Sequence, residues 1–358
     1  MRSLNTGFMT ISHETYMRRC IQLAMLGEGY VAPNPMVGAV LVHNNRIIGE
    51  GYHRVFGQAH AEVNCIESVS TEDRPLIEHS TMYVSLEPCS HFGKTPPCAD
   101  LIIRNRIPRV VVGCIDPFPE VKGKGIGMLQ AQGIEVISGI LQDECVALNR
   151  RFFTFQLQHR PYIVLKWAQS SNGNMARADR ARFAISNEYS RRLVHQWRSQ
   201  EASILVGTNT AFFDDPELTN RFWHGPQPVR LVVDMELRLP SSLKLFNNEV
   251  RTIVFNRRQH SDGEGVSYYQ VTTDVSLVHQ VAHALYHLKI QSVLVEGGPR
   301  LLQSFLDEGM WDEIRVLTNE QLAMTEGIPA PVVCNAQKIL TRRILTDRLD
   351  VYKPIPQA

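Results

Sequence analysis

The sequence lacks an excess of charge of either sign. Its 358 residues include 37 Lys and Arg against 36 Asp and Glu, so the formal net charge is +1 at pH 7 with neutral histidines. A protein that binds nucleic acid or an anionic membrane through its overall charge is typically strongly basic. Composition therefore favours neither partner, and we expect no nucleic acid and no membrane, although a local basic patch stays open.

Long apolar runs and a disulfide pattern are also missing. No apolar stretch approaches the roughly 18 residues that cross a bilayer, and residues 1–12 hold one Arg and no apolar segment of the secretory type. Seven cysteines, an odd number in a long chain, argue against a disulfide framework and for a reducing compartment. We therefore expect a cytoplasmic protein.

Internal repeats and low-complexity segments are not found, and the second half has no G-x-G-x-x-G fingerprint, so a Rossmann cofactor site is not supported. What the sequence has is ordinary globular composition, 44% hydrophobic and 20% charged residues. A chain of this length favours two domains.

The first half alternates between strand and helix patterns. Amphipathic or capped stretches predict helices at 13–28, from about Ala59, and at 97–106. Short apolar runs predict strands at 37–43, 46–52, 81–87 and 109–116, the first two joined as a hairpin by Asn44-Asn45. Alternation of this kind indicates an α/β sheet with both faces covered.

A second α/β series follows residues 149–161, which have no clean periodicity. Strands are predicted at 162–168, 203–207, 229–234, 251–255, 292–298 and 313–318, with helices at 187–199, 275–288 and 299–308. We therefore predict a domain at 1–148, a linker at 149–161 and a second domain at 162–358.

The most specific motif is His60-Ala61-Glu62, followed by Pro88-Cys89 and by Cys98. Zinc accepts imidazole and thiolate ligands, and one His with two Cys leaves the fourth position open for water. The ion acidifies that water, and Glu62 at a helix start can carry its proton to a leaving amine. This is the arrangement of zinc nucleobase deaminases. A chance His-x-Glu and two buried structural cysteines are the alternative.

Four segments together resemble one family: "NPMVGAV" (34–40), "GYH" (51–53), "HAEVNC" (60–65) and "EPCSHFGKTPPCADLII" (87–103). They are similar to the deaminase half of the bifunctional RibD enzymes of riboflavin biosynthesis, whose long insert between the two cysteines this chain shares. The resemblance implies a cytidine-deaminase-like α/β/α domain in which His60, Cys89 and Cys98 bind one Zn²⁺ and Glu62 is catalytic. It implies substrate contacts from Asn34, His53, Ser90, His91 and Lys94.

The auxiliary residues have plainer alternatives. Asn34 between two prolines can shape a turn, and His53 can be a polar residue of the core. Phe118 stands where many members of the family have Asn, which removes one substrate hydrogen bond.

The second half carries a glycine pair after a strand, in "VLVEGGPRLLQSFL" (293–306), and an acidic pair in "VGTNTAFFDDPELTNR" (206–221). Glycines admit a close ligand and a helix N-terminus offers N–H groups to phosphate, but each motif alone can be only a turn. With "KWAQSSNG" (166–173) they resemble the reductase domain of the same family, which is dihydrofolate-reductase-like. The resemblance implies NADPH contacts from Ala168, Thr210, Asp214, Gly298, Pro299, Arg300, Leu301, Leu302, Gln303 and Ser304. It implies substrate contacts from Arg198, Leu218, Arg221 and Glu296.

Three positions depart from the family. Asn172 replaces an Asp, Ala184 replaces a Trp, and residues 318–331 replace a Pro-x-Leu-Leu-Gly segment. The favoured reading is a bifunctional enzyme that deaminates 2,5-diamino-6-ribosylamino-4(3H)-pyrimidinone 5′-phosphate and reduces the product, 5-amino-6-(5-phosphoribosylamino)uracil, with NADPH. The resemblance also implies a homo-oligomer, a dimer or tetramer. The alternatives are a deaminase with a silent reductase-like half, a zinc deaminase of nucleic-acid bases, or a metal-stabilised structural module.

Overall fold

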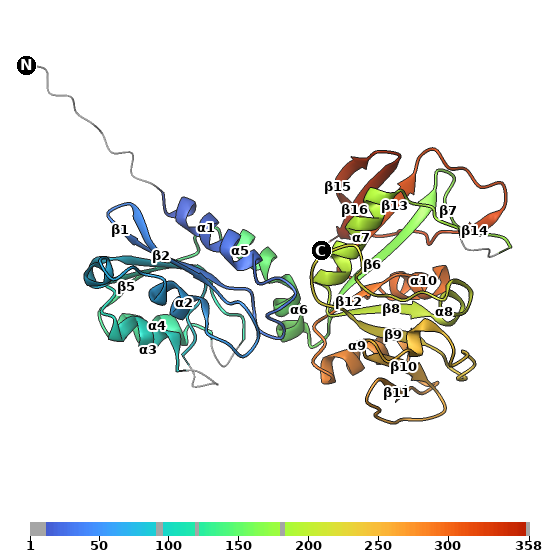
Figure 1. The fold of residues 1–358 in the computed structure, drawn as a ribbon, viewed down its shortest axis with the longest axis horizontal. Helices are drawn as coiled ribbons and strands as arrows, with labels where there is room; N and C mark the ends of the chain where they lie inside the picture. Colours follow the sequence, from blue (N-terminus) through green and yellow to red (C-terminus); the bar gives the residue numbers. More distant parts are fainter. Residues whose placement is uncertain (1–11, 91–95, 119–121, 180–182, 356–358) are drawn as a thin grey trace, which may run out of the picture. The chain divides into compact units, whose positions relative to one another are not determined.

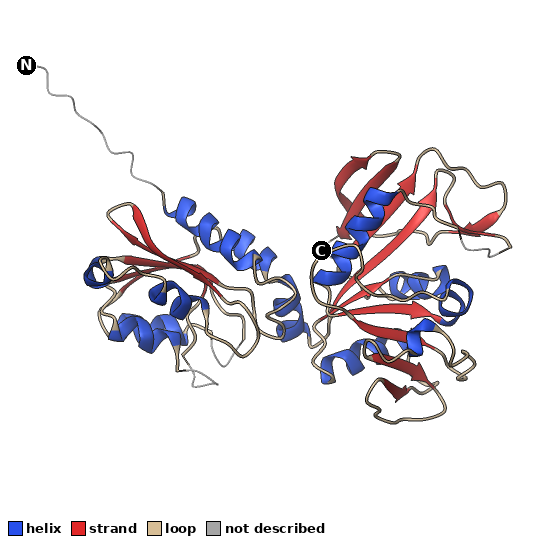
Figure 2. Cartoon of the chain, in the orientation of Figure 1, coloured by secondary structure: helices blue, strands red, loops and turns tan. Residues whose placement is uncertain are grey.

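The computed structural model describes residues 12–90, 96–118, 122–179 and 183–355. Contacts between Cα atoms divide the chain into two compact units, residues 1–158 and 159–358. Figures 1 and 2 show a separate sheet with its own helices in each unit. In the described part of the chain, no helix is long and apolar enough to cross a membrane.

The first unit is built on a five-stranded sheet of order β2-β1-β3-β4-β5. The hairpin β1–β2 is antiparallel and β1 also pairs antiparallel with β3, whereas β3, β4 and β5 are parallel. The strands are β1 (Gly38–His43), β2 (Arg46–Tyr52), β3 (Thr81–Leu86), β4 (Arg109–Cys114) and β5 (Glu135–Ser138). The helices are α1 (His13–Met25), α2 (Ala61–Glu67), the 3₁₀ helix η1 (Arg74–His79), α3 (Cys98–Arg104), α4 (Lys124–Ala131), α5 (Gln142–Leu148) and α6 (Arg150–Gln158).

Alternating side chains bury both faces of this sheet. Leu41, Met82 and Val110 pack with α2, α3 and α4 on one face, and Val40, Tyr83 and Val111 pack with α1, α5 and α6 on the other. The period of two along each strand makes this three-layer arrangement possible. The prediction of a sheet covered on both faces is therefore confirmed for the first unit.

The second unit holds a nine-stranded sheet of order β11-β10-β9-β8-β12-β6-β13-β16-β15. The run from β11 to β13 is parallel, and β16 and β15 extend it as an antiparallel hairpin. The strands are β6 (Tyr162–Ser170), β8 (Ser203–Gly207), β9 (Val229–Val233), β10 (Thr252–Asn256), β11 (Val266–Gln270), β12 (Ser292–Val295), β13 (Glu313–Asn319), β15 (Ala336–Ile344) and β16 (Asp347–Pro354). A separate pair joins β7 (Asn174–Arg177) to β14 (Gly327–Pro329).

Helices cover both faces of the second sheet as well. They are α7 (Glu188–Gln200), α8 (Thr208–Asp214), the 3₁₀ helix η2 (Lys244–Phe246), α9 (Leu277–His287) and α10 (Pro299–Asp307). Ile163, Leu165 and Trp167 of β6 pack in the core that contains α9 and α10, while Tyr162 and Val164 face the core that contains α7.

Several elements differ from the sequence predictions. The stretch 149–161, predicted as an irregular linker, is mostly the helix α6, which buries Phe152, Phe153 and Phe155. Its buried residues, Phe152 to Phe155, are four consecutive positions, so no apolar stripe of helical period marks the helix in the sequence. The helix α8 was predicted only as a turn motif, and β15 and β16 were not predicted at all.

Candidate active sites

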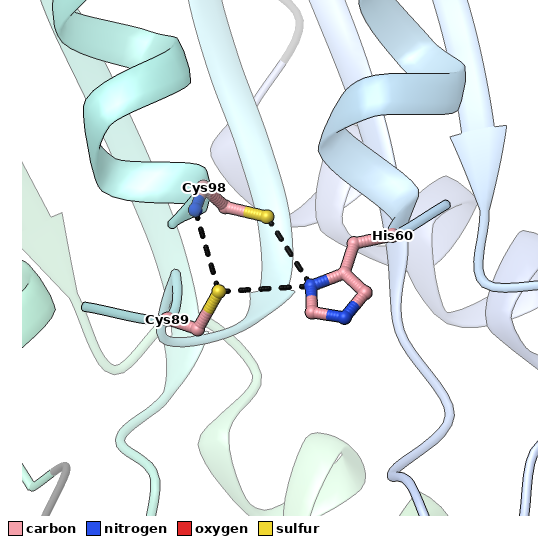
Figure 3. Close-up of side chains that lie close together, drawn as sticks. All are labelled: His60, Cys89 and Cys98. Carbon is pink, nitrogen blue, oxygen red and sulfur yellow. Dashed lines mark hydrogen bonds between the residues drawn. The ribbon is translucent and has the colours of Figure 1, made fainter. Parts of the chain in front are cut away.

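Three side chains from separate elements of the first unit converge at one point. His60 caps the N-terminus of α2, Cys89 follows β3, and Cys98 is the first residue of α3. Figure 3 shows the two sulfurs directed at the imidazole. His60 Nδ1 lies 3.6 Å from Cys89 Sγ and 3.3 Å from Cys98 Sγ.

These distances fit a zinc ion. Zinc bonds of about 2.0–2.1 Å to nitrogen and 2.3 Å to sulfur, at tetrahedral angles, place nitrogen and sulfur about 3.5 Å apart. All three candidate ligand atoms lie within 4.8 Å of one another, and the donor set is the one that zinc prefers. Among the described residues, this is the one group of three or more such side chains that could hold a metal.

The fold also favours a thiolate at Cys89. The backbone N–H of Cys98 donates to Cys89 Sγ at 3.3 Å. Hydrogen bonds from Cys98 and His60 lower the pKa of Cys89 to about 4, against the effect of burial. Thiolate is the form that binds metal, so these contacts make Cys89 a suitable candidate ligand.

Glu62 lies in the first turn of α2, two residues after His60, with 3% of its surface exposed. Burial, with the negative charge of Cys89, raises its pKa to about 7. A carboxyl group of that proton affinity can both accept and donate a proton near neutral pH. A hydrogen bond with Cys98 places it beside the cluster.

His53 and Asn34 form a hydrogen-bonded pair. His53 Nδ1 lies 3.0 Å from the carbonyl oxygen of Ala59, and because that oxygen can only accept, Nδ1 carries the proton. His53 Nε2 therefore accepts from Asn34 Nδ2, at 3.2 Å. This bond fixes which way the Asn34 amide points. Burial lowers the pKa of His53, which favours the neutral ring. The predicted substrate residue His53 thus holds the predicted substrate residue Asn34 in orientation.

The remaining predicted deaminase residues are only partly described. Ser90 is half-buried and directly follows Cys89, while His91 and Lys94 lie outside the described residues. Phe118 is half-buried, and its N–H donates to Asp116 Oδ1.

The sequence analysis missed Glu87. Its buried carboxylate accepts four backbone N–H groups, from Asp116, Gly123, Gly125 and Ile126, at 3.0 to 3.3 Å. A Cβ on Gly125 would lie 1.9 Å from the Pro88 carbonyl oxygen, so the start of α4 packs directly against the Pro88-Cys89 segment. Glu87 thus holds the loop before α4 against the segment that carries Cys89. The sequence does mark Glu87 in one way, because an acidic residue stands at the end of the apolar strand predicted at 81–87.

In the second unit, a buried ion cluster forms where β12, β6 and α7 meet. Arg198 Nε and Nη2 each donate to one oxygen of Glu296 at 2.9 Å, and Lys166 Nζ lies 3.8 Å from Glu296 Oε2. Burial alone would raise the pKa of Glu296, but the charges of Arg198 and Lys166 hold it at about 2. Lys166 was quoted only as part of a motif; the structure places it in the cluster.

Within the described part of the chain, the hydrogen bonds of Arg198 occupy three of its five N–H donors. Its Nη1 also donates to the Thr219 carbonyl oxygen at 3.1 Å. These three bonds leave one N–H on each terminal nitrogen, because a guanidinium carries five. Two parallel N–H groups suit a phosphate or a pair of hydroxyl oxygens.

The segment 217–221 lies beside this cluster, but its side chains differ in role. The Arg221 backbone N–H donates to His195 Nδ1 at 2.9 Å, while its guanidinium pairs with Glu217. Leu218 is 2% exposed and its side chain packs in a hydrophobic core, so only its backbone could contact a ligand.

Of the predicted NADPH residues, Thr210 follows β8 and Gly298 follows β12, and the structure brings these two together. Gly298 caps α10, and a Cβ placed on it would lie 3.2 Å from Thr210 Oγ1 of α8. Asp214 ends α8 and Ala168 is half-buried on β6. The open N-terminus of α10, with glycine before it, fits a phosphate group.

Helix geometry separates the predicted residues of α10. Leu301 and Leu302 bury their side chains in the core, so only their backbone groups could face a cofactor. Pro299 has no N–H and so cannot donate a backbone hydrogen bond to one. Arg300 is exposed in the first turn. Ser304 Oγ donates to the Arg300 carbonyl oxygen at 2.9 Å, and Gln303 accepts from Val332 N, also at 2.9 Å. The side chains of Gln303 and Ser304 are therefore already engaged.

Asn172, which replaces a family Asp, makes hydrogen bonds through both its amide nitrogen and its amide oxygen. Its Nδ2 donates to the Met324 carbonyl oxygen at 2.7 Å, and its Oδ1 accepts from Met324 N at 3.1 Å. A carboxylate cannot make the first of these bonds, so Asn172 matches the altered segment around Met324. Ala184 is exposed.

The fold and the two sites together define a zinc-type pyrimidine deaminase joined to a nicotinamide-dependent reductase. Residues 10–114 match the cytidine and deoxycytidylate deaminase zinc-binding region, and residues 161–319 match the RibD C-terminal domain.

Relatives and solved structures agree with this division. The riboflavin biosynthesis protein RibD of Aquifex aeolicus is 41% identical over 320 residues, 88% of each chain, and that of Escherichia coli is 34% identical over 324 residues, 85% of this chain and 86% of its own. The crystal structure of the Thermotoga maritima diaminohydroxyphosphoribosylaminopyrimidine deaminase/5-amino-6-(5-phosphoribosylamino)uracil reductase matches with a TM-score of 0.88 at 36% identity, covering 95% of this chain and 98% of its own. RibD of Acinetobacter baumannii matches with a TM-score of 0.87 at 30% identity and the same coverage.

The chain belongs to the RibD family of riboflavin biosynthesis. It is a bifunctional enzyme with a zinc-binding deaminase domain followed by a reductase domain of a family that uses NADPH. The predicted family, fold class, enzyme type and cofactors are confirmed.

Proposed function

We propose that the first unit deaminates 2,5-diamino-6-ribosylamino-4(3H)-pyrimidinone 5′-phosphate and that the second unit reduces the ribosyl group of the product, 5-amino-6-(5-phosphoribosylamino)uracil. The observation that carries the proposal is the convergence of His60, Cys89 and Cys98 beside the buried acid Glu62. The Thermotoga maritima protein, whose printed name gives both reactions, supports the choice of substrates.

In the deaminase site His60, Cys89 and Cys98 would hold the zinc ion. When bound, zinc lowers the pKa of water and so supplies a nucleophile near neutral pH. Glu62 accepts the proton of that water and delivers it to the amino group that leaves as ammonia, so the pyrimidine gains an oxygen and loses nitrogen. Asn34, oriented by His53, hydrogen-bonds the pyrimidine. The resemblance to the family implies further substrate contacts from Ser90, His91 and Lys94.

Glu87 acts as a positioning residue in this scheme. Its four backbone contacts hold the loop before α4 against the segment that carries Cys89. Loss of these bonds would loosen one wall of the site without removing a zinc ligand.

In the reductase site the cofactor residues would be Ala168, Thr210, Asp214 and the turn from Gly298 to Ser304, that is Gly298, Pro299, Arg300, Leu301, Leu302, Gln303 and Ser304. Bound NADPH supplies the hydride that reduces the open-chain ribosyl carbonyl. Arg198 presents its two remaining N–H groups to the substrate, and ionised Glu296 accepts from ribosyl hydroxyl groups. Leu218, through its backbone, and Arg221 complete the substrate contacts.

The alternative of a silent reductase half rests on Asn172 and Ala184. Asn172 has a structural use of its own, and the buried cluster of Arg198, Glu296 and Lys166 is intact. Both observations favour an active reductase.

We also propose that the two domains, predicted at 1–148 and 162–358, meet within residues 149–161, and that α6 belongs to the first because it packs in the core of that unit. A homo-oligomer and a cytoplasmic location complete the proposal. The resemblance to the family supports the first, and the seven free cysteines support the second.

The variant Glu62→Gln tests the deaminase assignment, because it removes the proton carrier and keeps the ligands. We expect zinc to stay at one per chain and ammonia release to fall by about 10³-fold or more. Oxidation of NADPH on supplied deaminated intermediate should be unchanged, because it uses the other unit. Ammonia release at the parent rate would refute the mechanism.

A further inference from the structure

Helix α9 of the reductase unit carries three histidines on its exposed side. His279, His283 and His287 are spaced four residues apart, which turns each only about 40° from the last around the helix. The opposite side packs in the core of the sheet through Val278, Val281, Ala284 and Leu285. The histidines therefore form a stripe that the packing of the helix does not require.

Two of the three rings point their nitrogens at each other. His283 Nε2 and His287 Nε2 lie 2.9 Å apart, with ring centroids 4.2 Å apart and planes at 61°. Two imidazole nitrogens at that distance must share a proton or a cation, because two lone pairs repel and two N–H groups collide. Exposed neutral imidazole is also a common ligand of divalent transition metals.

We propose that His283 and His287 form a second metal site, which binds a divalent transition ion with ligands at right angles, Ni²⁺ or Cu²⁺. Metal–nitrogen bonds of about 2.05 Å place cis nitrogens about 2.9 Å apart at 90° and about 3.3 Å apart at a tetrahedral angle. The observed separation matches the first geometry. Zn²⁺ requires the rings to move apart and binds more weakly.

The third histidine of the stripe has another partner. His279 Nε2 lies 3.4 Å from Glu308 Oε2, so the proposed site has two protein ligands among the described residues. It differs from the first site in having no thiolate and in exposing both ligands. We therefore expect reversible binding that imidazole displaces.

Binding should stabilise the reductase unit. The two ligands belong to successive turns of α9, so they meet only when the helix is folded, and a metal that binds the folded state raises its stability by mass action. Because α9 packs into the sheet core, the effect should extend to the whole unit.

The test uses full-length protein with zinc already bound, titrated with NiCl₂ by calorimetry while zinc release is followed. We expect one Ni²⁺ per chain, no zinc release, and at least ten-fold weaker binding in His283→Gln and in His287→Gln. His279→Gln, on the same face, should bind as the parent does. Unchanged affinity in both pair variants, or an equal loss in His279→Gln, would overturn the assignment.

A spectroscopic measurement makes the test independent of the variants. The EPR spectrum of one equivalent of Cu²⁺ added to the parent protein should show coupling to two imidazole nitrogens. Coupling to one nitrogen or to none would overturn the proposal.

Discussion

Replacing Glu296 by Gln removes the carboxylate that two buried cations share. Arg198 donates twice to Glu296, Lys166 lies 3.8 Å away, and the side chains of Arg198, Lys166 and Glu296 are 8 to 12% exposed. The variant leaves two positive charges buried with a neutral amide between them. We expect the reductase unit to lose stability and reductase activity together.

The structure gives the size of this loss in two ways. The pKa of Glu296 falls from an ordinary 4.5 to about 2, which corresponds to about 3 kcal/mol at roughly 1.4 kcal/mol per tenfold change in proton affinity. Breaking a buried ion pair by removing one partner costs about 3–5 kcal/mol. Both values are consistent with a loss of about 3 kcal/mol in the free energy of unfolding.

Urea unfolding followed by tryptophan fluorescence measures this loss in the correct unit. All four tryptophans of the chain, Trp167, Trp197, Trp223 and Trp311, lie in residues 159–358, so the signal reports the reductase unit alone. Glu188→Gln is the matched control, because Glu188 pairs with Arg192 on the surface of the same unit, both more than half exposed. It should change the free energy by less than about 1 kcal/mol.

Low pH should reduce the difference between parent and Glu296→Gln. A carboxyl group whose pKa is lowered by folding contributes its full stabilisation above the ordinary value of 4.5, and the contribution disappears as pH falls toward about 2. A loss below 1 kcal/mol at pH 7, or a difference that grows on acidification, would refute the reasoning.

Three further predictions concern other parts of the chain. Glu87→Gln should raise the KM for the deaminase substrate about ten-fold or more, with zinc kept at one per chain. The control Glu135→Gln, which removes an exposed ion pair with Arg109, should change neither the KM nor the zinc content. Loss of zinc in Glu87→Gln would contradict a positioning role. Asn172→Asp should lower the free energy of unfolding of the reductase unit by about 1–2 kcal/mol, because a carboxylate would face the Met324 carbonyl oxygen. A gain in reductase activity would instead indicate that Asn172 impairs the reductase of the parent protein. Zinc removal by a chelator should abolish ammonia release and leave NADPH oxidation on supplied intermediate within about two-fold, and loss of both would contradict separate sites.

Much of the fold could be predicted because the central strands are short apolar runs. The stretches 203–207 and 313–318 are almost wholly buried in the sheet, so their sequences carry the signal directly. Strand β15 could not be found this way, because it lies at the sheet edge and nearly all of its residues are exposed. An edge strand is specified by its neighbour β16 rather than by its own apolar pattern.

The convergence of His60, Cys89 and Cys98 could also be predicted, since these residues are chemically distinctive and lie in segments that resemble the family. Contacts made by backbone groups were not predictable. The four N–H groups that meet Glu87, and the Met324 peptide that meets Asn172, come from segments distant in sequence, and no side-chain pattern marks them. Lys166 was missed for the same reason, because only the pairing of β6 with β12 brings it near Glu296.

One assay tests the central claim, that this chain carries out two consecutive reactions. Purified protein with one zinc per chain is given 2,5-diamino-6-ribosylamino-4(3H)-pyrimidinone 5′-phosphate and NADPH, and ammonia release and NADPH oxidation are recorded separately. We predict that ammonia appears first, that NADPH oxidation follows, and that the two reach equal amounts. Ammonia without oxidation of NADPH would contradict an active reductase, and the absence of both signals would contradict the substrate assignment.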